Sequence, residues 1–204
     1  AYCDLALPQY TSDIVDVGIQ QSGIADVAPQ KIRKDTMENL ILFMPDQDVT
    51  YLNQYYKQTD NNVFECTTKD KQTIENLNTI FGVPMLMLSS LNSSADSSTE
   101  KMSDSSMEAF SKMDMNTLKQ MYQTGQITKE QILKMRGQMI NKFGDMSESI
   151  ISQRAILFVK QEYEALNVDI GKMQIDYLLY KGFKMLLLSV VMIIAAVAVG
   201  YLAS

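Results

Sequence analysis

The chain has 204 residues, of which 18 are basic and 24 are acidic, so its formal net charge is −6. This balance argues against a nucleic-acid partner, because phosphates are bound by a basic face. The absence of histidine excludes imidazole-based acid–base catalysis and histidine-ligated metal sites in this chain. Cys3 and Cys66 are too few for a disulfide scaffold or a structural zinc site, and the sequence leaves open whether they are bridged.

The first part of the chain predicts helices separated by turn residues. Apolar residues at positions 14, 15, 17 and 19 suggest a short helix that ends near Gly18 and Gly23. Pro29 is expected near the start of the next helix, where its missing N–H does no harm. Asp35 precedes an apolar pattern of helical spacing, and Pro45 both ends that helix and opens another over residues 46–58.

A single strand is predicted in the chain, over residues 63–68 (VFECTT), after the turn signal TDNN. Asp70 then starts a helix, which Gly82 and Pro84 are expected to end.

A serine-rich segment, residues 89–107, contains nine serines in nineteen residues. Such a segment cannot bury enough apolar surface to offset its ordering entropy, so we expect a mobile loop. This loop would divide the polar part of the chain into two lobes.

The second lobe is also predicted to be helical. Gly125 fits a helix C-terminus, and Thr128 with Gln131 forms a capping box for the helix that follows. Another helix is expected over residues 147–166, and the segment NVDIG breaks it. A last helical pattern begins at Met173 and continues into the apolar C-terminal run, so the fold class is all-α.

The chain closes on nineteen residues without a charge, from Met185 to Ala203. As a helix this run is about 28 Å long, close to the thickness of the hydrocarbon core of a bilayer. The sequence therefore predicts a membrane span, and the alternative is a central buried helix of a globular core. Lys181 and Lys184, just before the run, are expected to anchor it at the headgroups.

Two carboxylates, Asp46 and Asp48, lie two residues apart at a predicted helix start. As calcium ligands they lack the glycine and the distant glutamate of an EF-hand loop. They are better explained as acidic residues that stabilise the positive end of the helix dipole.

The methionines and tyrosines also admit more than one interpretation. The chain contains fifteen methionines, and Met113 and Met115 suggest a soft-metal site. Packing in an apolar core is favoured, and a methionine-rich groove for an apolar ligand or peptide is the intermediate alternative. Tyr51, Tyr55 and Tyr56 are interpreted first as packing residues with surface hydroxyls, and second as a ligand surface.

Two segments resemble parts of bacterial ATP-binding-cassette exporters of the fused permease–ATPase type. Residues 7–20 (LPQYTSDIVDVGIQ) are similar to the point where the first membrane helix leaves the membrane, and residues 177–204 are similar to the second membrane helix. The pattern in the first segment consists of Pro8, Ile14, Val15, Asp16, Gly18 and Ile19.

The resemblance implies three regions: the extracellular end of the first membrane helix over residues 1–17, an extracellular helical insertion domain over 18–172, and the second membrane helix over 173–204. In most such exporters a short loop joins these helices, whereas about 150 residues intervene here. The chain has no initiator methionine and no basic flank after its apolar run, so we expect a fragment of a longer protein.

The parent protein implied by the resemblance is a multi-pass protein of the cell membrane with six membrane helices and an ATPase domain that uses ATP and Mg²⁺. Its partners would be the lipid bilayer, a second identical or different subunit, and a peptide, drug or lipid substrate. No nucleotide-binding motif occurs in this chain, so we assign no catalytic, cofactor-binding or metal-binding residue to it.

The enlarged loop would cap the exit, bind a substrate or partner, or report such binding inward. The alternative from another class is an extracellular sensor or receptor module with a membrane anchor. A helical pore-former is a third alternative, which the single apolar run disfavours.

Overall fold

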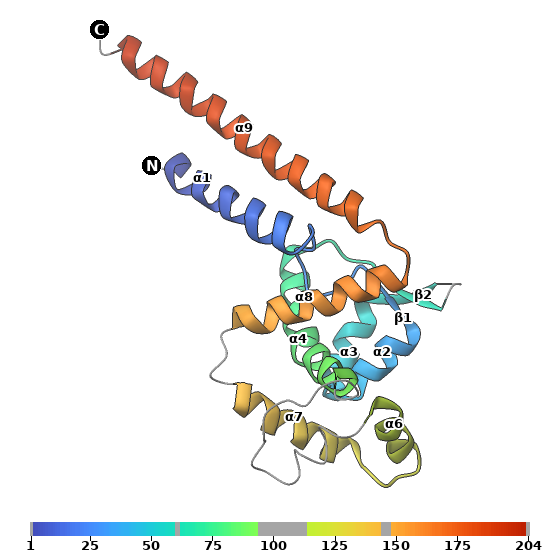
Figure 1. Ribbon diagram of the computed structural model, residues 1–204. Helices are drawn as coiled ribbons and strands as arrows, with labels where there is room; N and C mark the ends of the chain where they lie inside the picture. Colours follow the sequence, from blue (N-terminus) through green and yellow to red (C-terminus); the bar gives the residue numbers. More distant parts are fainter. Residues whose placement is uncertain (1, 60–61, 94–113, 144–147, 203–204) are drawn as a thin grey trace. The chain divides into compact units, whose positions relative to one another are not determined.

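The computed structural model describes residues 2–59, 62–93, 114–143 and 148–202 (Figure 1). It is 76% helix and 7% strand, which confirms the all-α class. The chain separates into two compact units. We call residues 1–25 with 167–204 the hairpin, and residues 26–166 the insert.

The hairpin consists of two helical segments from opposite ends of the chain, which lie side by side (Figure 1). Helix α1 (Tyr2–Asp13) continues into the π-helix η1 (Ile14–Gln20), and both pack on α9 (Ile170–Leu202). The expected helix therefore passes through Gly18, and it is followed by a turn in which Ser22 and Gly23 have φ angles of 55° and 79°.

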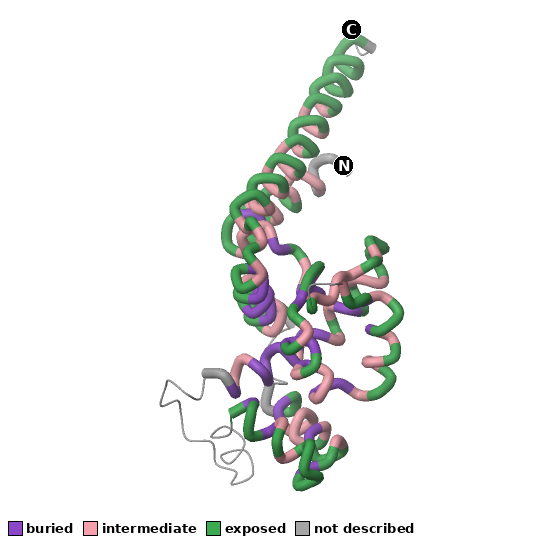
Figure 2. The backbone as a smooth tube through the Cα atoms, turned by 90° about the vertical axis from the view of Figure 1, so that its right-hand side faces the viewer, coloured by how far each residue is buried: buried purple, intermediate pink, exposed green. Residues whose placement is uncertain are grey.

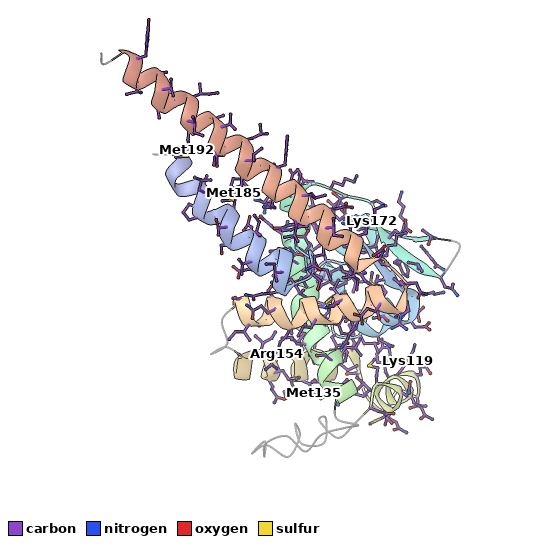
Figure 3. All side chains as sticks on the ribbon, turned by 45° about the horizontal axis from the view of Figure 1, so that its top comes forward. Lys119, Met135, Arg154, Lys172, Met185 and Met192 are labelled. Carbon is purple, nitrogen blue, oxygen red and sulfur yellow. The ribbon has the colours of Figure 1, made fainter. Side chains whose placement is uncertain are left out.

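The two segments run antiparallel with a regular contact pattern. Their less exposed positions recur every three or four residues, as in the seam of a coiled coil. These positions are Leu7, Tyr10, Ile14 and Val17 on one segment, and Gln174, Leu178, Lys181, Met185, Leu188 and Met192 on α9. Figure 3 shows Met185 and Met192 on the side of α9 that faces α1.

The insert contains a small antiparallel sheet with the strand order β1-β3-β2. Its strands are β1 (Lys31–Arg33), β2 (Tyr56–Thr59) and β3 (Val63–Cys66). The structure confirms a strand at the predicted place, although β3 ends at Cys66, two residues before the predicted end. The prediction of a single strand is wrong, and so is the helix start expected at Pro29, because β1 follows it. Both missed strands have three or four residues, too few to show an alternating pattern.

Helices α2 (Lys34–Ile41) and α3 (Asp46–Tyr55) follow the predicted order, and Pro45 is the residue before α3. The next helix, α4 (Lys71–Ser93), starts after Asp70 as predicted. The Asp70 carboxylate accepts hydrogen bonds from the backbone N–H and the hydroxyl of Thr73, at 2.9 and 2.7 Å. These bonds lower the pKa of Asp70.

The end predicted for this helix at Gly82 and Pro84 is wrong, because α4 continues to Ser93. A proline inside a helix costs about 3 kcal/mol, and burying one large apolar side chain contributes roughly 1.5–3 kcal/mol. Packing on both sides of Pro84 therefore outweighs its local preference. The buried residues there are Leu77, Phe81, Met85, Leu86, Met87, Leu88 and Leu91.

The serine-rich segment is partly helical, because α4 includes residues 89–93. Residues 94–107 lie outside the described part of the chain, so the predicted mobility of 89–107 stays a prediction.

Three helices complete the insert: α6 (Met115–Gln123), α7 (Lys129–Phe143) and α8 (Glu148–Ala165). Gly125 follows α6 with a φ of 72°, as its predicted role at a helix C-terminus requires. The capping box is also confirmed: the Gln131 side chain accepts from the Thr128 N–H at 2.8 Å, and the Thr128 hydroxyl accepts from the Gln131 N–H at 3.3 Å.

The expected two lobes form one compact unit, which corrects that prediction. Helix α4, from before the serine-rich segment, packs against α8, from after it. Val159 and Ala155 of α8 are fully buried, as are Phe81 and Leu77 of α4. Figure 2 shows buried residues in the helices of the insert, whereas the described residues of α9 are exposed or intermediate and none is buried.

Candidate functional site

One helix in the described part of the chain is long and apolar enough to cross a membrane, Ile170–Tyr201. Its apolar side chains are exposed on several faces; for example, Ile193 is 63% and Val197 67% exposed. A central helix of a globular core would be buried, so that alternative for the apolar run is wrong. Since water disfavours such a surface, the helix is suited to a lipid environment.

An ion pair joins the two segments of the hairpin. Lys181 Nζ lies 2.6 Å from Asp13 Oδ2, and the two side chains are only 20% and 25% exposed. The Lys181 ammonium is also 5.6 Å from the ring centroids of Tyr10 and Tyr177. Lys181 therefore pairs with a residue of α1, and its predicted role as a headgroup anchor stays a prediction.

Lys184 lies one turn further along α9. Its ammonium is 4.4 Å from the ring centroid of Tyr180, and both residues are exposed. This pairing of an amine with an amphipathic ring is typical of a membrane–water interface.

Two glycines allow the hairpin segments to approach closely at the end next to the insert. The Gln174 amide donates to the carbonyl of Gly18 at 2.8 Å. A Cβ atom on Gly18 would lie 2.5 Å from Cδ2 of Leu178, and one on Gly23 would lie 2.8 Å from Cα of Gln174. A Cβ on Gly18 would therefore meet a side chain that can rotate away. A Cβ on Gly23 would meet backbone atoms that cannot move aside in this way.

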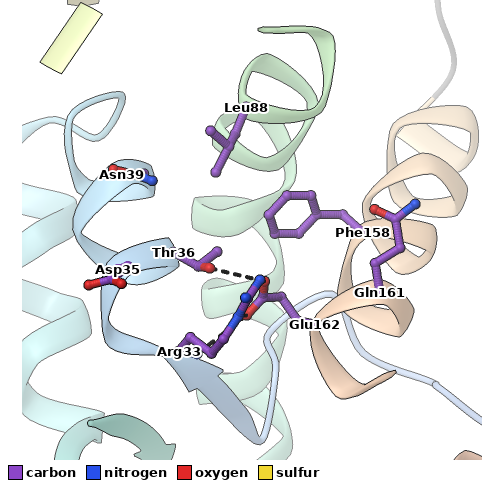
Figure 4. Close-up of a pocket in the computed structure, with 8 residues that line it drawn as sticks. All are labelled: Arg33, Asp35, Thr36, Asn39, Leu88, Phe158, Gln161 and Glu162. Atoms are coloured by element: carbon purple, nitrogen blue, oxygen red, sulfur yellow. Dashed lines mark hydrogen bonds and ion pairs between the residues drawn. The ribbon is translucent and has the colours of Figure 1, made fainter. Parts of the chain in front are cut away.

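In the insert, Glu162 is the centre of a buried polar cluster (Figure 4). It is 4% exposed and accepts from Arg33 Nη2 at 2.5 Å, Arg33 Nε at 3.2 Å and the Thr36 hydroxyl at 3.0 Å. The backbone N–H of Arg33 donates a fourth bond, at 3.3 Å. The bonds to Glu162 are the main reason that the pKa of Arg33 is raised.

The cluster borders a cavity of about 280 Å³ between α2, α4 and α8, with Leu88 and Phe158 as its apolar walls. Since both oxygens of Glu162 are already bonded to Arg33 and Thr36, the carboxylate is not arranged to take up a proton from a bound molecule. The cluster instead fastens β1 and α2 to α8. Next to it, the Tyr163 hydroxyl accepts from the Gln30 N–H at 2.8 Å, and burial raises the pKa of Tyr163 to about 12.

Asp46 and Asp48 lie in the first turn of α3, as the dipole interpretation requires. Two cations of α7 interact with them: Asp46 partly offsets the burial that lowers the pKa of Lys129, and Asp48 does the same for Arg136. Lys129 also donates to the Ile41 carbonyl at 2.6 Å. No group of three metal-ligating His, Cys, Asp or Glu side chains occurs in the described residues.

Six methionines pack in the core of the insert, as the favoured interpretation predicts. Met115 is one of them, at 7% exposed, whereas Met113 lies outside the described residues. The six are Met37, Met44, Met85, Met87, Met115 and Met139.

The tyrosines also serve packing. The rings of Tyr51 and Tyr55 lie 5.1 Å apart, and the ring of Tyr56 meets Phe81 edge-on at 5.5 Å. The expected surface hydroxyl is wrong for Tyr56, which is 3% exposed and donates to the Pro29 carbonyl at 2.7 Å.

Cys66 of β3 is a half-buried free thiol. The Cys3 side chain lies outside the described side chains.

Sequence reasoning missed Asp13, Arg33 and Glu162. Glu162 had a detectable signal, because it continues the apolar stripe of α8 formed by Ala155 and Val159. A carboxylate at such a position needs a cation nearby, but the sequence offered 18 candidates.

Comparison of the chain with models of protein families, with curated proteins and with solved structures finds no match.

Proposed function

We propose that this chain is part of the membrane region of an ATP-driven exporter. In this proposal α1 and η1 form the extracellular end of one membrane helix and α9 is the next membrane helix. The insert is then an extracellular domain carried between them. ATP and Mg²⁺ would act in an ATPase domain for which this chain contains no motif.

The observation that carries the proposal is the topology of the two units. The chain enters the insert from the first segment of the hairpin and returns to its second segment after the insert. Helix α9 in that second segment is long and apolar enough to cross a membrane. An enlarged loop between two neighbouring membrane helices has this arrangement.

The motif that resembles the exporters has a consistent place in the hairpin. Pro8 lies in α1, and the other five residues of the pattern lie in η1, the segment that packs on α9: Ile14, Val15, Asp16, Gly18 and Ile19. Gly18 is the buried member, at the close approach to Leu178. In this proposal the pattern marks the point where the first membrane helix passes into the extracellular domain.

The mechanism follows from the attachment at both ends. ATP binding and hydrolysis change the arrangement of membrane helices, and a domain tied to two of them responds to that change. A ligand that binds the insert differently in two transporter states would shift the population toward one state. The insert would then cap the exit, bind the substrate or a partner, or report binding inward.

The test is ATP-dependent efflux of a fluorescent dye from cells that express the full-length parent protein, including its ATPase domain, with and without residues 26–166 of this chain. The variant joins Ala25 to Asn167 through a short Gly/Ser linker, and membrane insertion is checked by fractionation. We expect the intact protein to export and the variant to lose export or its regulation. Equal export would rule out all three roles of the insert. No ATP-dependent export by the intact protein would overturn the exporter and favour the sensor module.

Topology is tested separately by replacing the exposed Asn53 with cysteine in a Cys3→Ser, Cys66→Ser background. An impermeant thiol reagent should label Asn53→Cys in intact cells. Labelling only after lysis would place the insert inside the cell.

A further inference from the structure

The cavity beside the Glu162 cluster has polar groups on its lining that the cluster does not use (Figure 4). Its volume of about 280 Å³ is just below the roughly 300–1,000 Å³ of pockets that take drug-sized molecules. Every residue of the lining belongs to the insert, from β1, α2, α4 and α8. The cavity therefore suits a small metabolite that is bound by the insert alone.

Glu162 holds the Arg33 guanidinium by one edge only. Nε and Nη2 of Arg33 donate to the carboxylate at 3.2 and 2.5 Å, whereas Nη1 donates to no group in the described part of the chain. The Arg33 side chain is 50% exposed and lines the cavity, so its remaining N–H groups are accessible there. A guanidinium that is fixed in this way offers a flat pair of donors, which matches the two oxygens of a carboxylate.

Two acceptors of α2 line the cavity one helical turn apart. Asp35 is exposed and forms no ion pair or hydrogen bond with another described residue. The Asn39 Oδ1 atom is buried, and it too lacks a hydrogen-bond partner within the described ranges. Residues four apart share a helix face, and rotation of the Asn39 amide about its terminal bond presents this oxygen to a donor in the cavity. An ammonium group has three N–H donors and one positive charge, so it would satisfy both acceptors.

The two free charges of the lining lie near one another. The bond to Glu162 raises the pKa of Arg33 most, and the negative charge of Asp35 raises it further, so Asp35 acts on the guanidinium at short range. A ligand with a carboxylate alone would be repelled by Asp35, and one with an ammonium alone would leave the free edge of Arg33 unpaired. An α-amino acid carries both groups on one carbon atom and matches two partners that are close together.

The apolar wall of the cavity completes the match. Leu88 of α4 and Phe158 of α8 form this wall and are 3% and 7% exposed (Figure 4). A branched aliphatic group placed against them loses contact with water at no polar cost.

We propose that this cavity binds a zwitterionic α-amino acid with an apolar side chain. The carboxylate of the ligand pairs with the free edge of Arg33, and its ammonium group pairs with Asp35 and Asn39. Its side chain contacts Leu88 and Phe158. The inference goes beyond the exporter proposal and does not rest on it, because the site lies within the insert and binding requires no ATP.

The test is isothermal titration calorimetry of the full chain in detergent micelles, with protein-free micelles as the blank. The probe is L-leucine. Two analogues each lack one charged group: isocaproate has the carboxylate without the ammonium, and isoamylamine has the ammonium without the carboxylate. We expect L-leucine to bind with a Kd of about 1 mM or lower, and each analogue to bind at least tenfold more weakly.

The variant Asp35→Asn identifies the partner of the ammonium group. It should weaken L-leucine at least tenfold, so that L-leucine binds no more tightly than isocaproate. Asp46→Asn is the matched control, because Asp46 is also an exposed acidic residue in the first turn of a helix and does not line the cavity. It should leave the Kd of L-leucine unchanged. Circular dichroism checks that both variants fold, and the analogue series in the unmodified protein does not depend on either.

Three results would overturn the proposal: no binding of L-leucine, an analogue that binds as tightly as L-leucine, or equal effects of Asp35→Asn and Asp46→Asn. Export is measured in cells with ATP, whereas binding is measured without it. Failure of the exporter and failure of the amino-acid site are therefore observed in separate experiments.

Discussion

Glu162 concentrates more hydrogen bonds than any other carboxylate in the described insert, and it does so almost without contact to water. Its two oxygens accept from Arg33, from the backbone of Arg33 and from Thr36. All of its lone pairs accept hydrogen bonds, and removing its charge leaves Arg33 without its counter-ion.

We expect Glu162→Gln to destabilise the protein by roughly 2–3 kcal/mol, because it removes the ion pair and turns one acceptor into a donor that faces Arg33. This expected loss of stability is smaller than for a fully buried ion pair, since the Arg33 side chain is half exposed. Urea unfolding followed by circular dichroism measures the loss. Glu164→Gln, two residues along α8 and exposed, should cost less than 0.5 kcal/mol. Equal effects of the two variants would contradict the role of the cluster.

Tyr163 makes stability depend on alkaline pH. Burial raises its pKa to about 12 in the folded protein, whereas an unfolded tyrosine titrates near 10. Its neutral hydroxyl therefore contributes stability that is complete below pH 10 and is lost as the pH rises toward 12, by roughly 1.4 kcal/mol per pH unit.

The Tyr163→Phe variant should lose less stability between pH 10 and 12 than the unmodified protein. At pH 7 it should be less stable by about 1 kcal/mol, because the Gln30 N–H loses its acceptor. Urea midpoints measured at pH 8, 10 and 11 check both effects. Burial raises the pKa of Tyr56 as well, so part of the alkaline loss should remain. If the urea midpoints of Tyr163→Phe and of the unmodified protein fell equally between pH 8 and 11, the assignment of this loss to Tyr163 would be contradicted.

At the scale of elements, the approach of η1 to α9 depends on Gly23. A side chain there meets two obstacles, the backbone of Met173 and Gln174 and a φ of 79° that L-residues rarely adopt. We expect Gly23→Ala to loosen the hairpin, so that amides of η1 exchange hydrogen at least tenfold faster. Hydrogen-exchange mass spectrometry of residues 14–24 measures this.

Gly137→Ala is the control for that variant. Nothing lies within 4 Å of a Cβ at Gly137 in the middle of α7, so alanine should stabilise this helix by roughly 0.5–1 kcal/mol. Unchanged exchange in η1 of Gly23→Ala would show that the close approach does not hold the hairpin together.

The elements differ in how well their sequence predicts them. The capping box of α7 and the Asp70 cap of α4 use local bonds, so residue types at fixed spacing were enough. The helix end predicted at Pro84 was wrong because the local preference of proline is outweighed by packing against residues far away in sequence, such as Val159. The partners Arg33 and Glu162 are separated by 129 positions, and no local pattern joins them.

At the scale of the whole molecule, the insert has its own core and sheet, and the chain crosses between insert and hairpin only at 25–26 and 166–167. Residues 26–166 expressed alone should therefore remain soluble and unfold in one cooperative transition. Circular dichroism during heating measures this. A gradual transition or dye binding typical of a molten state would mean that the insert needs the hairpin to fold.

The packing of Gly23 on Gln174 has a consequence for how the insert folds. It holds together two points of the chain that are separated by the entire insert. Closing a loop of about 150 residues costs an unfolded chain roughly 4 kcal/mol of entropy, and this cost disappears once the ends are already fixed. A hairpin embedded in a bilayer would thus act on the insert as a long-range disulfide does, without any sulfur: it restricts the unfolded ensemble and leaves the native contacts unchanged.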